Sequence, residues 1–432
     1  MNNKQPGIIS RRTYLKSSGA AGAVGLAGLA GCMGGDNGDG GEESELEIAH
    51  WWTAGGEEEA IEALIEGFQE EYPDYEVSNN PTPGGAGSAL EADVRNRVID
   101  GNPPSTFQIW PGEALTIYTE EDLLEDLSDS VWDEEMEGAY LDGPRELSQD
   151  DEGAFVAVPI NIHRLNNLFY NVEVVEEAGV SPEEIEDPTA LIEALEAVEA
   201  TGATGMIHQL QEPWSTLQLW ENALLGLDPE AYQTTIDGDP ETVEAEVREA
   251  LELTAAYAEF FNDDASSVAW DEANNRIISG DAAFIHQGDW AAGQYEASEE
   301  FEFEENWNYI PFPGTDGLYQ TVMDSFVMPT DNPSPEATEA FLSYAGTTDA
   351  QARFNVEKGS IPPRTDVDMG EFTPFLQAQM EDFENSEDQP PQIAHGLALP
   401  PDQQSEMEGA FANFNESFDP NQTYDEIVAV FE

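Results

Sequence analysis

The sequence predicts an α/β protein of two lobes. Strand and helix patterns alternate from residue 46 onward, the alternation restarts near residue 167, and extended segments that contain proline separate the two series at 155–161 and 308–313. Proline is excluded from central strands, so these segments are typical of crossings between domains. Two lobes joined by two crossings form a hinge with a cleft between them.

The first 45 residues predict an exported and tethered protein. Residues 10–16 carry a twin-arginine pattern, and the weakly apolar run 17–31 ends directly before Cys32, the one cysteine of the chain. This run is shorter than the ~20 apolar residues that a spanning helix needs. We expect residues 1–31 to be a removed twin-arginine lipoprotein signal, Cys32 to be the lipidated residue, and the acidic, Gly-rich residues 32–45 to be a flexible linker.

The charge of the chain restricts its partners. There are 91 Asp and Glu residues against 13 Lys and Arg, a formal net charge of −78, and four of the basic residues leave with the signal. A surface of one sign repels itself at low ionic strength, whereas the screening length falls to about 3 Å near 1 M salt. We therefore expect a halophilic, archaeal protein that folds in salt and binds neither nucleic acid nor anionic lipid surfaces. Its 40% of hydrophobic residues exclude a disordered acidic chain.

The first lobe is expected at residues 46–160, with a return of the chain at about 313–350. Its strand and helix order predicts a mostly parallel sheet, whose ligands gather at the carboxyl ends of the strands. Trp51, Trp52, Gln108 and Trp110 lie at such ends. The predicted strands are 46–52, 75–79, 106–110 and, after the return, 321–328. The predicted helices are 57–72, 89–99, 113–118, 120–127 and 334–345.

The second lobe is expected at residues 161–312, with a second portion at about 351–432. Apolar residues recur there at helical and at alternating spacing in turn. The predicted strands are 167–170, 205–209 and 282–287. The predicted helices are 172–178, 189–200, 214–225, 241–261, 270–279, one that begins at 289, one after 372 and 403–418.

Few side chains carry chemical information in so acidic a chain. In this chain a pair of carboxylates is more typical of solvated surface than of catalysis. Lys358, in contrast, is the one lysine outside the signal. Its retention indicates a functional role, and a structural ion pair is the alternative. His163, His208 and His286 lack the spacing of metal ligands, so no metal site is expected, and we expect these histidines to be core or crossing residues. We expect the tryptophans at 132, 214, 220 and 307 to be structural, and Asn161 and Arg164 to form hydrogen bonds between the domains.

A series of short motifs follows in a fixed order along the chain. They are Ala49-His50-Trp51-Trp52, Thr106-Phe107-Gln108, residues 158–164, residues 288–293, Asp324-Ser325-Phe326, residues 358–361 and His395-Gly396. Together they resemble the glucose/galactose-binding branch of the extracellular solute-binding proteins of ABC sugar importers, in the same broad class as the maltose-binding protein. The likeness extends over nearly the whole chain after the signal.

The resemblance implies a periplasmic-binding-protein-like fold in which two lobes close on one monosaccharide. It implies a membrane permease as partner, a monomer at the extracellular face of the cell membrane, and neither catalysis nor a cofactor. It puts the sugar against a set of aromatic and polar side chains. These are Trp51, Trp52, Glu57, Gln108, Trp270, Trp290, Asp324, Lys358 and His395.

The chemistry of these residues suits a pyranose. Such a ring has apolar faces and an equator of hydroxyls, so its site needs aromatic planes together with paired donors and acceptors. We expect Lys358 to hold the buried Asp324 ionised. The resemblance implies a histidine two residues after Gln108, but this chain has Trp110 there. The change replaces a polar contact to the sugar with an aromatic face, so it leaves open whether the protein prefers a glucose-like sugar.

Two alternatives remain at this point. The same fold could bind a disaccharide or another polyol, and a secreted glycoside hydrolase would use a carboxylate pair across the same cleft. Glu57 suits a first-turn helix carboxylate as well as it suits a sugar contact.

Overall fold

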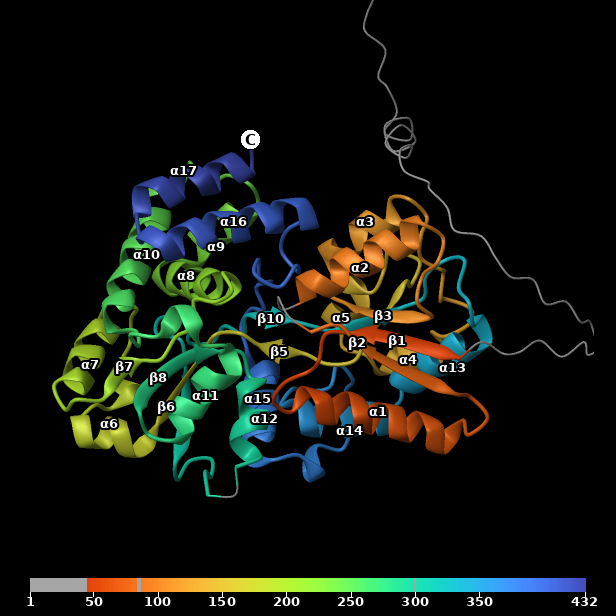
Figure 1. Cartoon of the computed structure of the whole chain (residues 1–432), viewed down its shortest axis with the longest axis horizontal. Helices are drawn as coiled ribbons and strands as arrows, with labels where there is room; N and C mark the ends of the chain where they lie inside the picture. Colours follow the sequence, from red (N-terminus) through yellow and green to blue (C-terminus); the bar gives the residue numbers. More distant parts are fainter. Residues whose placement is uncertain (1–44, 84–86, 299) are drawn as a thin grey trace, which may run out of the picture. The chain divides into compact units, whose positions relative to one another are not determined.

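The computed structural model describes residues 45–83, 87–298 and 300–432 (Figure 1). The expected signal, the lipidation residue Cys32 and the linker up to residue 44 lie outside these residues. Within the described ranges, none of the helices is long and apolar enough to pass through a bilayer.

The first lobe contains a five-stranded sheet of order β2-β1-β3-β11-β4. The strands are β1 (Leu46–His50), β2 (Val77–Pro81), β3 (Thr106–Ile109), β4 (Ala157–Pro159) and β11 (Ser325–Val327). Strand β1 pairs in parallel with β2 and β3, whereas β11 is antiparallel to both β3 and β4. The sheet is therefore mixed rather than mostly parallel, because β11 belongs to the segment that returns from the second lobe.

Helices cover both faces of this sheet. They are α1 (Glu57–Glu71), α2 (Ser88–Ile99), α3 (Thr116–Thr119), α4 (Glu134–Ala139), α5 (Asp142–Leu147), α13 (Pro335–Ala345) and α14 (Thr348–Lys358). Helix α1 buries Ile61, Leu64 and Phe68 in one core with Phe341 and Phe354 of α13 and α14. Segment 120–127, predicted as a helix, is a turn with an isolated bridge, because Asp122 takes a left-handed conformation (φ 53°).

The second lobe contains a four-stranded sheet of order β7-β8-β6-β9. The strands are β6 (Asn167–Asn171), β7 (Thr204–Met206), β8 (Ala282–Gln287) and β9 (Trp307–Pro311). The segment 308–313, predicted as a crossing, is thus largely a strand that pairs with β6 over five residues. Both β4 and β9 are edge strands that end in proline, and the chain leaves each sheet from there.

The two crossings pair with each other between the sheets. After β4 the chain forms β5 (His163–Arg164), and after β9 it forms β10 (Thr321–Val322); these short strands are antiparallel. The predicted strand 321–328 is therefore interrupted between β10 and β11, at Asp324. This interruption moves the backbone from the crossing ribbon into the first sheet.

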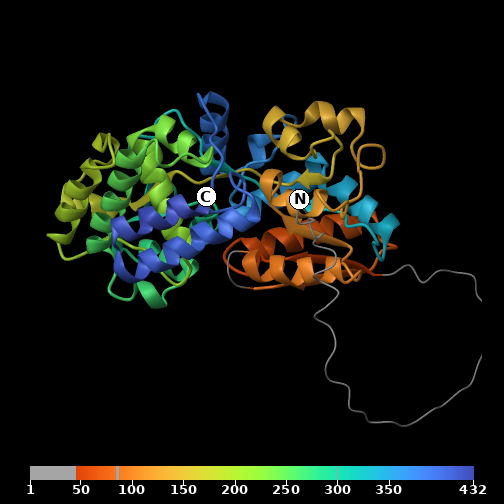
Figure 2. The same ribbon diagram turned by 90° about the horizontal axis from the view of Figure 1, so that it is seen from above.

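Helix α8 is at the centre of one helical group in the second lobe. The helices of this lobe are α6 (Val172–Ala178), α7 (Ala190–Glu199), α8 (Trp214–Leu227), α9 (Pro229–Ile236), α10 (Glu244–Tyr257), α11 (Trp270–Ile278), α12 (Ala291–Glu296), α15 (Pro374–Asn385), α16 (Pro401–Ser417) and α17 (Pro420–Val430). Residues 214–225 of α8 are all buried, because α9, α10 and α16 pack against it. Figure 2 shows the C-terminal helices, in dark blue, lying along the green helices of this lobe.

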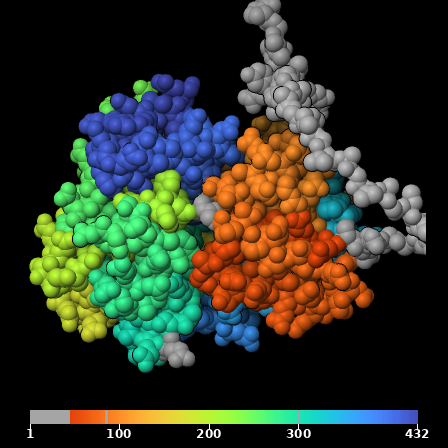
Figure 3. All heavy atoms as spheres, in the orientation of Figure 1, coloured from red at the N-terminus to blue at the C-terminus, as the bar shows by residue number. Residues whose placement is uncertain are grey.

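Helix α14 crosses the domain boundary expected near residue 350. It packs along α1 of the first lobe, and its Phe354 contacts Trp52 with ring centroids 4.9 Å apart. On this packing the first lobe continues to about Lys358 before the chain returns to α15. In Figure 3 the red and orange first lobe meets the green second lobe on the face shown.

Candidate ligand-binding cleft

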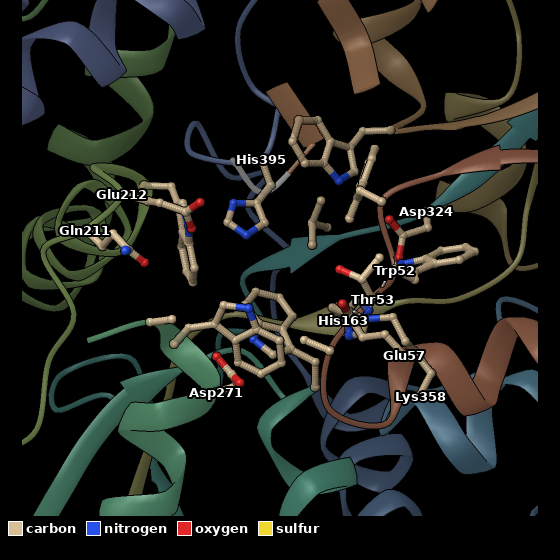
Figure 4. Close-up of a pocket in the computed structure, with 18 residues that line it drawn as sticks. Trp52, Thr53, Glu57, His163, Gln211, Glu212, Asp271, Asp324, Lys358 and His395 are labelled. Atoms are coloured by element: carbon tan, nitrogen blue, oxygen red, sulfur yellow. Dashed lines mark hydrogen bonds and ion pairs between the residues drawn. The ribbon is translucent and has the colours of Figure 1, made fainter. Parts of the chain in front are cut away.

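A cavity of about 290 Å³ lies between the lobes, where both crossings and the loops after the strands meet (Figure 4). In Figure 4, Asp324, Glu57, Lys358 and His163 lie together on one side, and Asp271 and Glu212 lie on the other. The lining residues are Trp51, Trp52, Thr53, Ala54, Glu57, Trp110, His163, Gln211, Glu212, Trp214, Ala269, Trp270, Asp271, Trp290, Val322, Asp324, Lys358 and His395.

Nine of the ten residues expected to contact a ligand line this cavity. The exception is Gln108, which lies behind Asp324. Its Nε2 donates to Oδ1 of Asp324 at 2.8 Å, and its Oε1 accepts from the backbone N–H of Trp51 at 3.1 Å. Gln108 therefore holds two cavity residues in place instead of facing the cavity itself.

Asp324 is buried at the break between β10 and β11, with 4% of its surface exposed. Oδ2 of Asp324 accepts from Nδ2 of Asn161 at 2.8 Å, and the backbone N–H of Asp324 donates to Oδ1 of Asn161 at 2.7 Å. Burial alone would raise the pKa of Asp324, but His163, Lys358 and Asn161 outweigh it and lower this pKa to about 2. The carboxylate is thus ionised, fixed from behind and free to accept hydrogen bonds from hydroxyls in the cavity.

Lys358 pairs with Glu57 rather than with Asp324. Its Nζ lies 2.9 Å from Oε1 of Glu57, because α14 places the lysine beside the first turn of α1. The prediction that Lys358 holds Asp324 ionised agrees with the charge of Lys358 lowering the pKa of Asp324, although the lysine forms its ion pair with Glu57. Burial raises the pKa of Glu57 despite this pairing. The same Nζ lies 5.9 Å from the ring centre of Trp290, across the cleft.

His163 connects the carboxylates of the two lobes. Its Nδ1 bonds to Oδ1 of Asp289, which precedes α12, and its Nε2 lies 3.5 Å from Oδ2 of Asp324. Burial and Lys358 would lower the pKa of His163, but Asp289 and Asp324 outweigh them and raise it. His163 was expected to be a core or crossing residue, and its place in the cavity wall was missed, although the crossing itself was predicted.

Aromatic rings form the opposite wall around His395. Its ring centroid lies 5.6 Å from that of Trp110, 5.4 Å from that of Trp214 and 5.3 Å from that of Trp290, with which it is stacked. Burial lowers the pKa of His395 to about 4, so the ring is neutral at neutral pH. Trp214 was expected to be structural; its position after β7, at the carboxyl end of a strand, was the signal that could have identified it.

Trp51 and Trp270 close the cavity from the two lobes. Trp51 contacts Trp110, with ring centroids 5.1 Å apart. Trp270 begins α11, and a methyl group added at Gly55 would lie 3.1 Å from its ring, so the lobes are in contact here. Trp52 is 1% exposed and packs between Phe326 and Phe354, so most of its ring belongs to the core.

The cavity has the chemistry of a binding site for a neutral, hydroxyl-rich solute. Indole planes face a group of hydrogen-bonding side chains in which Lys358 pairs with Glu57, and His163 lies between Asp289 and Asp324. Among the described residues, no group of three or more His, Cys, Asp or Glu side chains could hold a metal ion.

Comparisons with known proteins agree with this geometry. The family model described as bacterial extracellular solute-binding protein matches residues 63–381. The xylose/arabinose-binding protein of Haloferax volcanii is 40% identical over 392 residues, which are 90% of this chain and 84% of that protein. An uncharacterised ABC transporter extracellular-binding protein of Pyrococcus horikoshii is 32% identical over 89% of this chain and 86% of its own length.

A solved structure shares the fold. The bacterial solute receptor AcbH, described as having an exclusive preference for β-D-galactopyranose, matches with a TM-score of 0.76 at 16% identity, over 90% of this chain and 98% of that chain. At this identity the match shows the fold alone, and it confirms the predicted two-lobe α/β architecture of the periplasmic-binding-protein type. The chain therefore belongs to the bacterial extracellular solute-binding protein family, and it is a binding protein rather than an enzyme.

Proposed function

We propose that this protein is the sugar-binding component of an ABC importer and that it captures one monosaccharide in the cleft. The observation that carries the proposal is the composition of the cavity wall: Trp270 and Trp290 of one lobe face Asp324, Glu57 and Lys358 of the other. The two relatives described above are named as a sugar-binding protein and as an ABC transporter binding protein, which supports the same assignment.

Closure of the lobes provides the mechanism. Neither lobe alone surrounds the cavity, since the rings at 270 and 290 and the charged group at 57, 324 and 358 come from different lobes. A sugar that stacks on the indoles and donates to Asp324 binds the closed arrangement more tightly than the open one, so it shifts the population toward closure. The closed form is then the one that the permease receives.

The identity of the monosaccharide is the finer part of the proposal. The motifs favour a glucose- or galactose-like hexose, whereas the Haloferax relative is named for the pentoses xylose and arabinose. Trp110 favours the pentose, because its indole N–H beside His395 can only donate, whereas a histidine at this position could also accept a hydrogen bond from the exocyclic hydroxymethyl group of a hexose. We therefore propose an aldopentose as the first candidate and a hexose as the second.

We further propose that the protein acts at the extracellular face of the cell membrane and is anchored by a lipid on Cys32. The family is extracellular, and the twin-arginine and cysteine pattern of residues 10–32 supports the anchor. Mass spectrometry of the membrane fraction would test it: a Cys32→Ser variant should lose the lipid and leave the membrane.

Calorimetric titration in molar salt tests the sugar assignment. We expect one site per chain and a dissociation constant in the micromolar range or below for one of xylose, arabinose, glucose or galactose. Asp324→Asn, which keeps the shape and removes the charge, should weaken binding at least tenfold. Chromatography of the recovered ligand completes the test by identifying the bound sugar, and failure to bind any of the sugars would refute the proposal.

A further inference from the structure

The segment that carries His395 is held by a carboxyl group outside the cavity wall. Glu221 lies on α8 with 0% of its surface exposed. Its Oε1 accepts from the backbone N–H of Ile393 at 2.7 Å, and its Oε2 accepts from that of Ala394 at 3.1 Å. Because Ala394 directly precedes His395, Glu221 fixes the backbone from which that ring extends between the tryptophans.

The contacts of Tyr232 indicate the protonation state of this carboxyl group. Its Oη lies 2.7 Å from Oε1 of Glu221, 2.8 Å from the carbonyl oxygen of Pro391, and 3.1 Å from Nε2 of Gln320. A phenol has one proton, so Tyr232 cannot donate to the Glu221 carboxyl and to the Pro391 carbonyl at once; since a backbone carbonyl can only accept, both contacts are satisfied together only if Tyr232 donates to Pro391. The contact with Glu221, whose length is that of a full hydrogen bond, is then satisfied only if Glu221 carries a proton and donates it.

We propose that Glu221 is a positioning residue of the sugar site: as a neutral carboxylic acid it fixes the segment 391–395, and loss of its proton releases this segment and weakens binding. The step is a simple deprotonation. The carboxylate then competes with the Pro391 carbonyl for the single proton of Tyr232, and the segment loses one of its attachments. The sugar part of this inference depends on the function proposed above, whereas the movement of the segment does not.

The surroundings of Glu221 place this deprotonation in the alkaline range. Burial raises the pKa of Glu221 to about 8, against the hydrogen bonds that Ile393, Tyr232 and Ala394 would give to the ionised carboxylate, which lower it. Tyr232 is the one titratable side chain that bonds to Glu221 among the described residues, and burial raises its pKa well above the ordinary value. The other helices packed on α8, α10 and α16, contribute apolar side chains such as Leu251 and Phe411.

The test uses the tryptophans around His395 as a probe that needs no ligand. Intrinsic fluorescence of the full chain in molar salt is followed from about pH 6 to about pH 10, since Trp214 and Trp290 contact His395. The wild-type protein should show a transition near the pKa of Glu221. Glu221→Gln, which can still donate to Tyr232 but cannot ionise, should lack it. Affinity for D-xylose should fall about tenfold across the transition in the wild-type protein and stay within about twofold in the variant.

Glu296→Gln and Glu408→Gln are matched controls. Both side chains are partly buried and lie outside the cavity wall, and burial raises the pKa of each to about 7. Both variants should keep the wild-type transition. A transition that persists in Glu221→Gln would overturn the inference and would point to another group, such as His163, whose ring lies 5.2 Å from that of Trp290.

A second variant covers the case in which Glu221→Gln does not fold, as judged by circular dichroism. Tyr232→Phe removes the phenol that would donate to the ionised carboxylate, and this donation lowers the pKa of Glu221, so the transition should move to higher pH. An unchanged midpoint would overturn the inference. If the fluorescence results are as expected but no sugar of the panel binds at any pH, the proposed function fails and the role of Glu221 in positioning the segment stands.

Discussion

Lys358 lines the cleft and forms an ion pair with Glu57, with 2% of its side chain exposed. Lys358→Met removes the group that we propose as a donor to the sugar, so we expect calorimetry to show an affinity at least about 100-fold lower. Breaking a buried ion pair ordinarily destabilises strongly, because one charge is left unpaired. Here the remaining partner is Glu57, whose pKa is already raised, so it takes up a proton and thermal unfolding should show a loss of only about 1 to 2 kcal/mol.

The double variant Lys358→Met/Glu57→Gln separates binding from folding. It contains no unpaired charge, so it should recover the stability of the wild-type protein while its sugar affinity stays low. Wild-type affinity in the single variant would mean that the pair is structural, which is the alternative that the sequence left open.

His163 makes the stability of the folded protein depend on pH. Asp289 and Asp324 raise the pKa of His163 in the folded protein above its value of about 6.5 in the unfolded chain. The contribution of His163 to the free energy of unfolding is therefore full below about pH 6.5, and it is lost as the pH rises through the pKa of the folded state. We expect the difference in unfolding free energy between the wild-type protein and His163→Gln to be largest near pH 6 and to shrink in the alkaline range. Denaturant titrations in molar salt measure it, and a difference independent of pH would mean that His163 is neutral in the fold.

Trp110 is the residue on which the choice of sugar is expected to depend. Trp110→His introduces, beside His395, the histidine that the family resemblance implies at this position, so we expect the affinity ratio of glucose to xylose to rise by about tenfold. Trp110→Phe is the matched control, because it keeps an apolar ring and should leave the ratio unchanged. The same ranking of sugars in all three proteins would show that this position does not select the ligand.

At the scale of elements, α1, α12 and α14 meet through backbone rather than side chains. A methyl group added at Gly56 would lie 2.2 Å from the carbonyl oxygen of Glu357, and one added at Gly293 would lie 3.0 Å from the same atom. Gly56→Ala therefore forces α1 away from α14, and we expect an unfolding free energy about 1 to 3 kcal/mol lower, together with weaker sugar binding, since both helices carry cavity residues.

Gly409→Ala is the control for this prediction. Gly409 lies in α16, and a methyl group there meets no atom within 4 Å, so the substitution should stabilise the helix slightly. Equal effects of the two substitutions on unfolding and binding would show that the close approach at Gly56 is unimportant.

The elements that the sequence predicted well are those with a complete local pattern. The helix at 172–178 and the strand at 282–287 have the predicted bounds, because each combines clear periodicity with a boundary residue. Helix α14 was missed because its residues lack a clear apolar face, and α17 was missed although Asp419 caps its first turn. The prediction at 120–127 failed because helical spacing there is overridden by the conformation of Asp122.

The site could be predicted as a set of residues but not as a set of contacts. The order of motifs brought Trp51, Glu57 and Asp324 together, and the cavity contains all three. Which carboxylate pairs with Lys358 depends on the packing of α14 along α1, and this packing was not predicted. The place of Gln108 behind Asp324 depends in the same way on the pairing of β3 with β11.

At the scale of the whole molecule, the acidic surface should make folding depend on salt. Nine basic residues remain outside the signal against 91 acidic ones, so most carboxylates have no cationic partner. The screening length falls from about 10 Å at 0.1 M to about 3 Å at 1 M, so repulsion between neighbouring carboxylates is largely removed over this range. The melting temperature should accordingly rise steeply up to about 1 M salt and more slowly beyond it.

Helix α1 offers a local test of this repulsion. Glu58, Glu62 and Glu66 are exposed and spaced four residues apart, so like charges face each other along one side of the helix. Glu62→Lys converts two repulsive pairs into two attractive pairs and should raise the unfolding free energy by about 1 kcal/mol at low salt. The gain should disappear near 1 M salt, where the charges are screened, and Glu62→Gln should give about half of it. A gain that persists at high salt would come from helix propensity or packing, and the salt dependence of the fold would then have a cause other than repulsion between surface carboxylates.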